Sequence, residues 1–199
     1  MVGSEFRVVI DTAETLPFTF LGIKSDANQN NELITVHTMR ASLGRHPYSL
    51  GDYSIDCALG QVHVERKSRE DIWGTILGWP TGYEQDREMA GRRERFESEL
   101  NNLAKIDCSL VVVEATMGNC LANMPSWGKK SSETNAKIFF RSVLSYQQRW
   151  PTVQWQFCDD RRLAELTTYR WLNRFYLKHI KGLNREVRHR RNPRRNKRT

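Results

Sequence analysis

Long apolar segments and a secretory signal are both missing from this sequence of 199 residues. No apolar run approaches the roughly 20 residues that a membrane-spanning helix requires, so no contact with a membrane is expected. The first residues do not place an apolar stretch after a charged one, which argues against a signal peptide there. Residues 1–6 are interpreted as an extension or a cloning scar.

Cysteine is scarce, and its spacing is not that of a metal site. The chain has Cys57, Cys108, Cys120 and Cys158, and no two of them are separated by two residues. A zinc site is therefore not expected, and buried, reduced thiols are. Such usage suits a reducing compartment, so we expect a cytoplasmic or nucleoid protein, or a nuclear one in a eukaryote, rather than a secreted one.

Acidic residues are nearly absent from the end of the chain. Residues 185–199 (REVRHRRNPRRNKRT) hold eight Arg or Lys and one Glu, so this segment carries seven of the eight net positive charges. It has too few apolar residues to fold alone, and residues 184–199 are predicted to be a solvated arm. Such an arm binds DNA phosphates by releasing counterions, and the alternative is a solubilising tail without a partner. Its candidate DNA contacts are Arg188, Arg190, Arg191, Arg194, Arg195, Lys197 and Arg198.

Apolar runs alternate with helical patterns through residues 7–183, which we interpret as one domain. Strands are expected at residues 6–11, 33–39, 54–58, 61–67, 109–114 and 153–158. Helices are expected over residues 69–77, 84–105, 133–149 and 161–180, with a loop at residues 117–132. The uninterrupted apolar run at 109–114 is typical of a strand that is covered on both faces. The pattern predicts an α/β fold with a mixed central sheet flanked by helices.

The segment of residues 50–72 (LGDYSIDCALGQVHVERKSREDI) carries candidate chemistry. It places Asp52 one hairpin before Glu65 and Lys67, and side chains two apart on a strand share a face. Two carboxylates that meet at a sheet edge suit a hard divalent cation, which prefers oxygen ligands. A lysine beside them can orient or deprotonate a water, or stabilise developing negative charge. These are the parts that phosphodiester hydrolysis requires.

The longer pattern resembles the XPF-type structure-selective endonucleases, including the archaeal Hef nuclease, whose signature is GDY followed by ERKxxxD. Here the signature is Gly51-Asp52-Tyr53, then Glu65-Arg66-Lys67 and Asp71. The apolar run that ends in Asp11 and Glu14, the Arg95-Phe96 pair and the Val113-Glu114 strand end are also similar. The resemblance covers residues 7–114 in the correct order, and it implies the restriction-endonuclease-like core of the PD-(D/E)xK group.

The resemblance also implies roles. Asp52 and Glu65 would be ligands of Mg²⁺ or Mn²⁺, with Asp11 as a nearby acidic contributor. Lys67 would be the catalytic lysine, Arg66 would contact phosphate or the carboxylates of the site, and Asp71 would support the site from the start of a helix. An ideal strand aims Arg66 at the opposite face from Glu65 and Lys67, so that role requires a twist or a bulge.

Several of these residues have a purely structural alternative. Ser68 and Asp71 have the spacing of a capping box. Arg66 could pair with an acid elsewhere, Asp11 and Glu14 could only end a strand and cap the turn after it, and Glu114 could only end its own strand. For Asp52, Glu65 and Lys67 this alternative is weaker, because charges on an otherwise apolar strand are costly without a task.

Two departures from the family pattern concern DNA binding. Ala13 stands where the family has an arginine, and no helix-hairpin-helix pair follows the core. DNA would then be held by the tail and by Arg69, Arg92 and Arg93. The last helix has apolar residues on more than one face, which suggests a homodimer contact or simple burial on two sides.

The leading hypothesis is a Mg²⁺- or Mn²⁺-dependent endonuclease that hydrolyses DNA phosphodiesters, with branched, flap or junction DNA in repair or recombination implied by the family. The alternatives are a restriction- or resolvase-type nuclease on the same core, and a non-catalytic DNA-binding or scaffold subunit.

Overall fold

The computed structural model describes residues 6–24, 32–45, 48–78, 86–127 and 129–182. Six strands form one mixed sheet in the order β2-β1-β3-β4-β5-β6. The strands are β1 (Val8–Asp11), β2 (Thr38–Ala41), β3 (Tyr53–Ile55), β4 (Val62–Lys67), β5 (Cys108–Val113) and β6 (Val153–Phe157). The strand β3 is antiparallel to both of its neighbours, whereas β4, β5 and β6 run parallel. This is the mixed α/β sheet that the sequence predicts.

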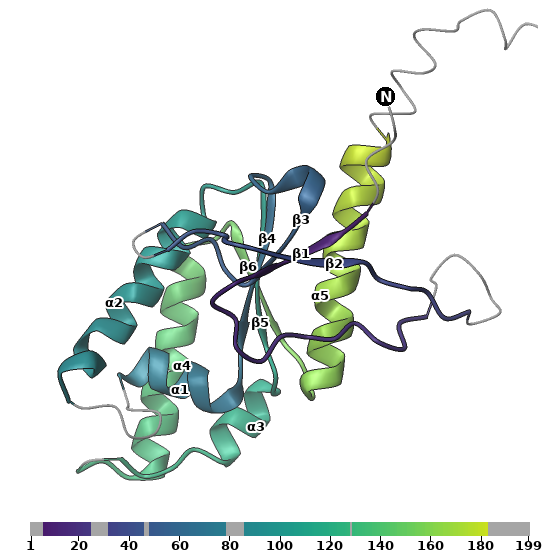
Figure 1. Ribbon diagram of the computed structural model, residues 1–199. Coiled ribbons are helices and arrows are strands. Elements are labelled where there is room, and N and C mark those ends of the chain that lie inside the picture. The colour runs from purple at the N-terminus through teal and green to yellow at the C-terminus, as the bar shows by residue number, and fades with distance from the viewer. Residues whose placement is uncertain (1–5, 25–31, 46–47, 79–85, 128, 183–199) are drawn as a thin grey trace, which may run out of the picture.

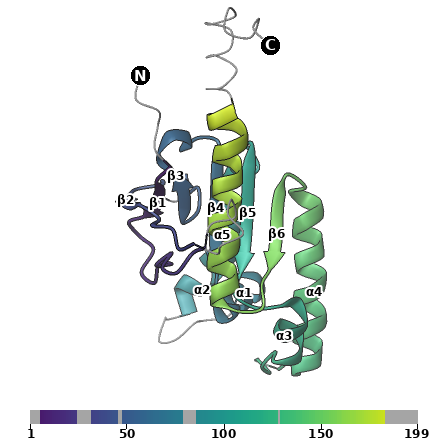
Figure 2. The same ribbon diagram turned by 90° about the vertical axis from the view of Figure 1, so that its right-hand side faces the viewer.

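Helices cover the two faces of this sheet unequally. The helix α5 (Arg161–Phe175), continued by a π-helical segment η2 (Tyr176–Lys181), covers one face. The opposite face carries α1 (Arg69–Leu77), α2 (Asp86–Leu103) and α4 (Ser132–Arg149), with the short α3 (Met117–Ala122) beside α4. Figures 1 and 2 show the sheet standing between α5 and the other helices.

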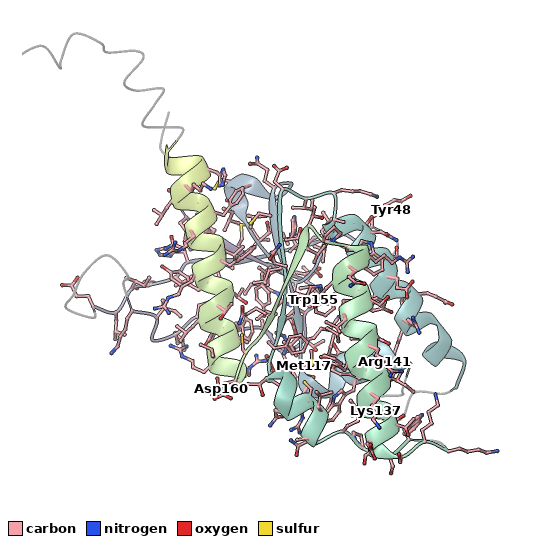
Figure 3. The ribbon with its side chains drawn as sticks, turned by 180° about the vertical axis from the view of Figure 1, so that it is seen from behind. Tyr48, Met117, Lys137, Arg141, Trp155 and Asp160 are labelled. Atoms are coloured by element: carbon pink, nitrogen blue, oxygen red, sulfur yellow. The ribbon has the colours of Figure 1, made fainter. Side chains whose placement is uncertain are left out.

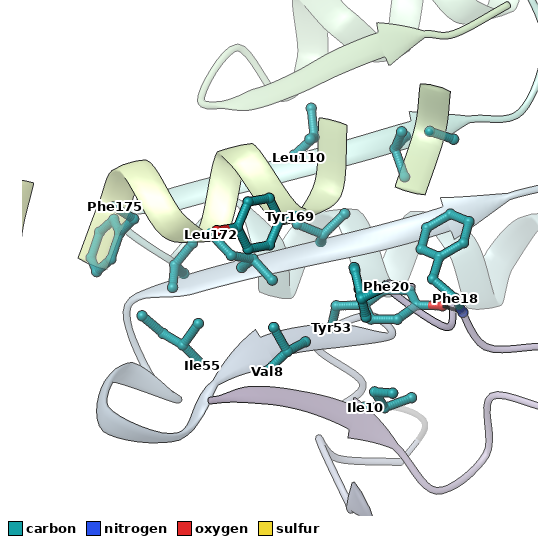
Figure 4. Packing of buried hydrophobic residues seen from close by; sticks show 14 of the residues in the cluster. Val8, Ile10, Phe18, Phe20, Tyr53, Ile55, Leu110, Tyr169, Leu172 and Phe175 are labelled. Atoms are coloured by element: carbon teal, nitrogen blue, oxygen red, sulfur yellow. Dashed lines mark hydrogen bonds between the residues drawn. The ribbon is translucent and has the colours of Figure 1, made fainter. Parts of the chain in front are cut away.

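The strand β5 shows how the sheet separates two apolar cores. Leu110 and Val112 pack into the cluster under α5, while Val111 and Val113 pack into the cluster under α1, α2 and α4. All four are at most 2% exposed, so the prediction of a strand covered on both faces is confirmed. Figure 4 shows Tyr169, Leu172 and Phe175 of α5 reaching down onto the strands.

Three sequence-based boundaries are wrong. The expected strand at residues 33–39 is displaced to β2, and Leu33 forms only an isolated bridge with Lys24. The expected loop at residues 117–132 contains α3, which begins after the N-cap Thr116. The regular part of the last helix ends at Phe175, after which the chain winds more widely as η2.

The four cysteines differ in burial. Cys120 and Cys158 are buried, Cys57 and Cys108 are half-buried, and all four are free thiols. None of the helices in the described ranges is both long and apolar enough to cross a membrane.

Candidate active site

A cavity of about 660 Å³ opens where the turn after β1, the chain before β3 and the helices α1 and α2 meet. Acidic and basic side chains are mixed in its wall, which is unlike the purely apolar lining of a core void. Its lining residues include Asp11, Ser49, Gly51, Asp52, Lys67, Asp71, Phe96 and Glu99, together with Arg45, Arg92 and Arg95.

Gly51 brings Asp52 to β4. Its φ of +92° lies in the left-handed region, and a Cβ built there would approach the backbone oxygen of Val64 to 2.9 Å. This position therefore requires glycine. The backbone N–H of Asp52 then donates to the Val64 oxygen over 2.9 Å, and the Asp52 Oδ2 accepts from the backbone N–H of Arg66 over 2.8 Å. The hairpin thus fixes one carboxylate oxygen of Asp52 against β4.

Glu65 and Lys67 lie on one face of β4, as their spacing predicts. Glu65 is 3% exposed, and its carboxylate forms an ion pair with the Lys67 ammonium. The Lys67 Nζ also lies 3.7 Å from the Asp71 Oδ2 and 5.0 Å from the centre of the Phe96 ring. Glu65 interacts electrostatically with Asp52, and both carboxylates interact with Lys67, so these charged groups form one electrostatic unit.

The carboxylates of this unit are hard to ionise together. Burial raises the pKa of Asp52 well above its usual value, and the charge of Glu65 raises it further. Burial likewise raises the pKa of Glu65, with Glu99 as the next cause. Burial alone would lower the pKa of Lys67, but the nearby carboxylates, Glu65 foremost, raise it well above its usual value. The amine is therefore protonated at neutral pH, and several carboxyl groups lie around it.

Glu99 is a member of the site that the sequence analysis did not find. It comes from α2, accepts a hydrogen bond from the Ser49 Oγ over 2.9 Å, and is hydrogen-bonded to the side chain of Glu65. Burial raises the pKa of Glu99, whereas Lys67 lowers it by a smaller amount. A signal was present in the sequence, because Glu99 interrupts the helical apolar stripe of Phe96, Leu100 and Leu103.

Asp11 lines the cavity, but both of its carboxylate oxygens accept hydrogen bonds from backbone N–H groups. Oδ1 accepts from the Ala13 N–H over 2.6 Å and Oδ2 from the Leu43 N–H over 2.5 Å. The side chain is 5% exposed. These bonds fix the turn after β1 to the chain after β2, and the role of Asp11 toward a metal stays a prediction.

Asp71 supports the site from the first turn of α1, and it also belongs to the cap of that helix. Its backbone N–H donates to the Ser68 Oγ over 3.1 Å, as the capping pattern predicts. Its side chain is 40% exposed and faces Lys67. The two interpretations of Asp71 are therefore compatible.

Arg66 points to the other face of the sheet, away from Lys67, and strand alternation alone explains this direction. Its Nε donates to Glu14 over 3.0 Å and its Nη1 to Glu114 over 2.8 Å. Arg161 donates to the same Glu114 oxygen over 2.6 Å, and both guanidinium groups lie over the ring of Phe18. The structure thus joins Arg66 to acids outside the cavity, and no bulge returns its side chain to Asp52 and Glu65.

The other predicted DNA contacts are divided between different surfaces. Arg92 lines the cavity, with Arg45 and Arg95, which the sequence analysis did not propose for this task. Arg93 pairs with Glu97 and faces away, and Arg69 pairs with Glu70 on the exposed side of α1. The seven predicted contacts of the tail, from Arg188 to Arg198, lie outside the described residues.

The acidic groups of the cavity suit a metal with few protein ligands. No three His, Cys, Asp or Glu side chains within the described ranges are grouped as a metal site by themselves. Burial and the charge of Glu65 both raise the pKa of Asp52, and a cation bound between the two carboxylates would offset their repulsion. Mg²⁺ is commonly held by one or two carboxylates and keeps several waters. The donor set therefore fits such an ion.

Comparison with known proteins identifies the fold. No protein-family model and no curated protein matches the sequence. Two solved structures are similar, both of XPF from Aeropyrum pernix. The one in complex with DNA has a TM-score of 0.50 and 14% identity, over 85% of this chain and 64% of that one. The second also has a TM-score of 0.50, with 16% identity over 90% of this chain and 69% of that one.

The chain spans somewhat less than two thirds of the length of the DNA-complexed structure. At 14–16% identity the likeness is one of fold. The six-stranded mixed sheet flanked by helices is the fold that the chain shares with these two structures, so the α/β fold with a mixed central sheet predicted from the sequence is confirmed.

Proposed function

We propose that this chain is a divalent-metal-dependent endodeoxyribonuclease, a hydrolase of DNA phosphodiester bonds. One observation carries the proposal: Asp52 and Lys67 line a cavity of an XPF-like fold, and the Lys67 ammonium forms an ion pair with Glu65. They come from the motif whose resemblance to XPF-type nucleases is visible in the sequence. Fold and motif therefore support the same chemistry independently of each other.

Asp52 and Glu65 are the residues that would hold Mg²⁺ or Mn²⁺. When bound, such an ion supplies a Lewis acid for the phosphoryl oxygen and lowers the pKa of a coordinated water. The backbone N–H of Arg66 keeps one oxygen of Asp52 in place. The ion pair with Lys67 orients Glu65. The protein thus presents two positioned carboxylates before any ligand arrives, which is the preorganisation that catalysis requires.

Lys67 acts as a cation in this proposal. Its pKa lies well above the usual value because the surrounding carboxylates outweigh burial, so the amine carries a positive charge at neutral pH. A buried ammonium at the cavity wall can stabilise the negative charge that develops on a phosphate during hydrolysis. Arg45, Arg92 and Arg95 line the same cavity and can neutralise neighbouring phosphates of the strand.

The substrate class is the more specific part of the proposal. One of the two similar structures is a complex of XPF with DNA, and the sequence motif resembles that of nucleases that cut branched DNA. We therefore propose flap, junction or other branched DNA, in repair or recombination, as the substrate. A restriction- or resolvase-type substrate would require the same chemistry and differs only in the shape or sequence that is recognised.

The proposal is tested by cleavage of labelled flap, junction and linear duplex DNA in Mg²⁺ or Mn²⁺. Asp52→Asn keeps an acceptor for the Arg66 N–H but removes the charge, so we expect cleavage to be lost and DNA binding to stay within about twofold. The matched control is Asp56→Asn, because Asp56 is an exposed carboxylate in the same hairpin, and it should cut normally.

A wild-type chain that binds these DNAs and cuts none of them with either metal would overturn the enzyme assignment. The scaffold interpretation would then hold.

A further inference from the structure

A second hollow lies on the other face of the sheet, between α5 and the edge strand β6. Its volume is about 460 Å³. Its wall includes Arg170, Arg174 and Lys178, with His179 at one end, and none of its lining residues is acidic. The cavity around Lys67 is lined by both acidic and basic side chains, whereas the charged side chains of the second hollow are all basic.

The cations of this hollow follow one line along the helix. Arg170 and Arg174 lie one turn apart on α5, Lys178 follows in η2, and all three line the hollow. All three side chains are exposed. Neither Arg174 nor Lys178 forms an ion pair with a residue that the structure describes. Their charge is therefore available to a partner of opposite sign.

The rest of the wall is aromatic and polar. Trp171 and Phe175 line the hollow from α5, and the Phe175 and His179 rings are stacked with their centres 4.6 Å apart. Gln156 lines it from β6, which has a neighbouring strand on one side only. A groove with a row of cations, a polar rim and no acid suits the backbone of a nucleic acid.

A second copy of this chain fits the groove less well. A two-fold axis across α5 would bring Arg170, Arg174 and Lys178 against the same residues of the partner, and like charges across an interface are costly. The chain also continues from this helix into residues 185–199, with eight Arg or Lys. The sequence that follows the groove therefore extends its positive charge.

We propose that the groove between α5 and β6 is a binding site for the phosphate backbone of DNA, separate from the cavity around Lys67. The identity of the polymer rests on the proposed function, whereas the polyanionic chemistry rests on the groove itself. The groove and the cavity around Lys67 lie on opposite faces of the sheet, so the groove would hold a different part of the bound DNA.

The test compares two full-length double variants for binding of a short labelled duplex in EDTA, where no cleavage occurs. Arg174→Gln with Lys178→Gln removes two charges from the groove. The control, Lys130→Gln with Arg141→Gln, removes two exposed charges from the side of α4, where Figure 3 labels Arg141. Both variants change the net charge equally, so a general effect of charge affects them alike.

We expect the groove variant to bind about tenfold more weakly than wild type near 0.1 M salt, and its log–log salt dependence to be shallower by roughly 1.8. The control should stay within about twofold. Equal affinities of groove variant and control would overturn the proposal. So would an unchanged DNA affinity with an altered sedimentation coefficient, because the groove would then be an interface between copies.

Cleavage at saturating DNA separates this proposal from the catalytic one. A groove variant that cuts at the wild-type rate once saturated supports both. A wild type that binds DNA through the groove but never cuts supports the groove and overturns the nuclease. A wild type that does not bind DNA overturns the groove proposal directly.

Discussion

The two faces of β4 carry similar residues in opposite electrostatic situations. On the α5 face, Arg66 meets Glu14 and Glu114, and Arg161 adds a second cation, so acids and bases are balanced. On the other face, the single amine of Lys67 faces the carboxylates of Asp52, Glu65 and Glu99, with Asp71 at the edge.

Balance and imbalance have different consequences. The α5-face network raises the pKa of Arg66 because its two carboxylates outweigh burial, and it ties together the turn after β1, β4, the end of β5 and the start of α5. The Lys67 face instead holds carboxylates whose ionisation is opposed by burial. The first arrangement stabilises the fold, and the second is the type of arrangement that binds a cation or moves a proton. Arg66 and Lys67, which are neighbours on β4, thus belong to two different kinds of charged network.

The largest expected effect is on stability, from Arg66→Gln. The side chain is 11% exposed, and its removal takes away the guanidinium that pairs with Glu14 and leaves Glu114 paired with Arg161. Breaking such a buried pair costs about 3–5 kcal/mol. Denaturant unfolding measures this loss, and Arg7→Gln is the control, because the exposed Arg7–Asp56 pair should contribute less than about 1 kcal/mol.

Equal losses for Arg66 and Arg7 would show that the α5-face network does not stabilise the fold. A folded Arg66 variant that fails to cut DNA would place Arg66 in the chemistry instead.

The next effect is expected from Lys67→Gln, on the rate of cleavage. Loss of a positioned cation near developing negative charge lowers kcat by about 10²–10³-fold. DNA affinity should change little, because the cavity keeps Arg45, Arg92 and Arg95. Single-turnover cleavage measures the rate, with Lys105→Gln as an exposed lysine control. A fall in affinity that matches the fall in rate would argue that Lys67 only binds the DNA backbone.

The smallest effect is expected from Glu99→Gln, as a pH-dependent change in Tm without metal. Burial raises the folded-state pKa of Glu99, so the folded protein holds this proton more tightly than the unfolded chain does. Its contribution to stability is therefore present at low pH and is lost as the pH rises through the folded pKa. Glutamine cannot ionise, so the Tm of the variant should exceed that of wild type increasingly above about pH 4.3, the usual glutamate value.

Thermal unfolding from acidic to alkaline pH tests this expectation. If the Tm of the variant and that of wild type change with pH in parallel, or if the variant has the lower Tm in alkali, ionisation of Glu99 does not destabilise the folded protein. The contrast between a balanced α5 face and an imbalanced Lys67 face of β4 would then be wrong.

The sequence predicts the parts of the site that one hairpin can assemble. Gly51, Asp52, Glu65 and Lys67 are close along the chain, and strand alternation is enough to place the last two on one face. The direction of Arg66 follows from the same rule, although its partners, Glu14 and Glu114, come from other elements. Local geometry therefore predicts the face of the sheet to which a side chain points, but not the residues that it contacts there.

What the sequence could not give depends on distant packing. Glu99 joins the site only because α2 lies beside β4, and a lone acid in an apolar stripe does not reveal its partner. The alternation of residues 33–39 suggested a strand, but the residues that pair in register with β1 on this side are 38–41. The helix α3 begins at the N-cap Thr116, whose hydroxyl accepts from the Asn119 N–H. The sequence did not predict this helix, because it is short and contains Gly118.

The ladder between β4 and β5 pairs every residue from Val62 to Lys67. Because side chains alternate strictly, a one-residue slip would exchange the two faces and send Arg66 toward the cavity and Lys67 toward Phe18. Single insertions or deletions inside this strand should therefore abolish both activity and stability, whereas the turn at Leu59 and Gly60 can change length more freely. Related chains should vary in the length of that turn and keep the spacing of the strand.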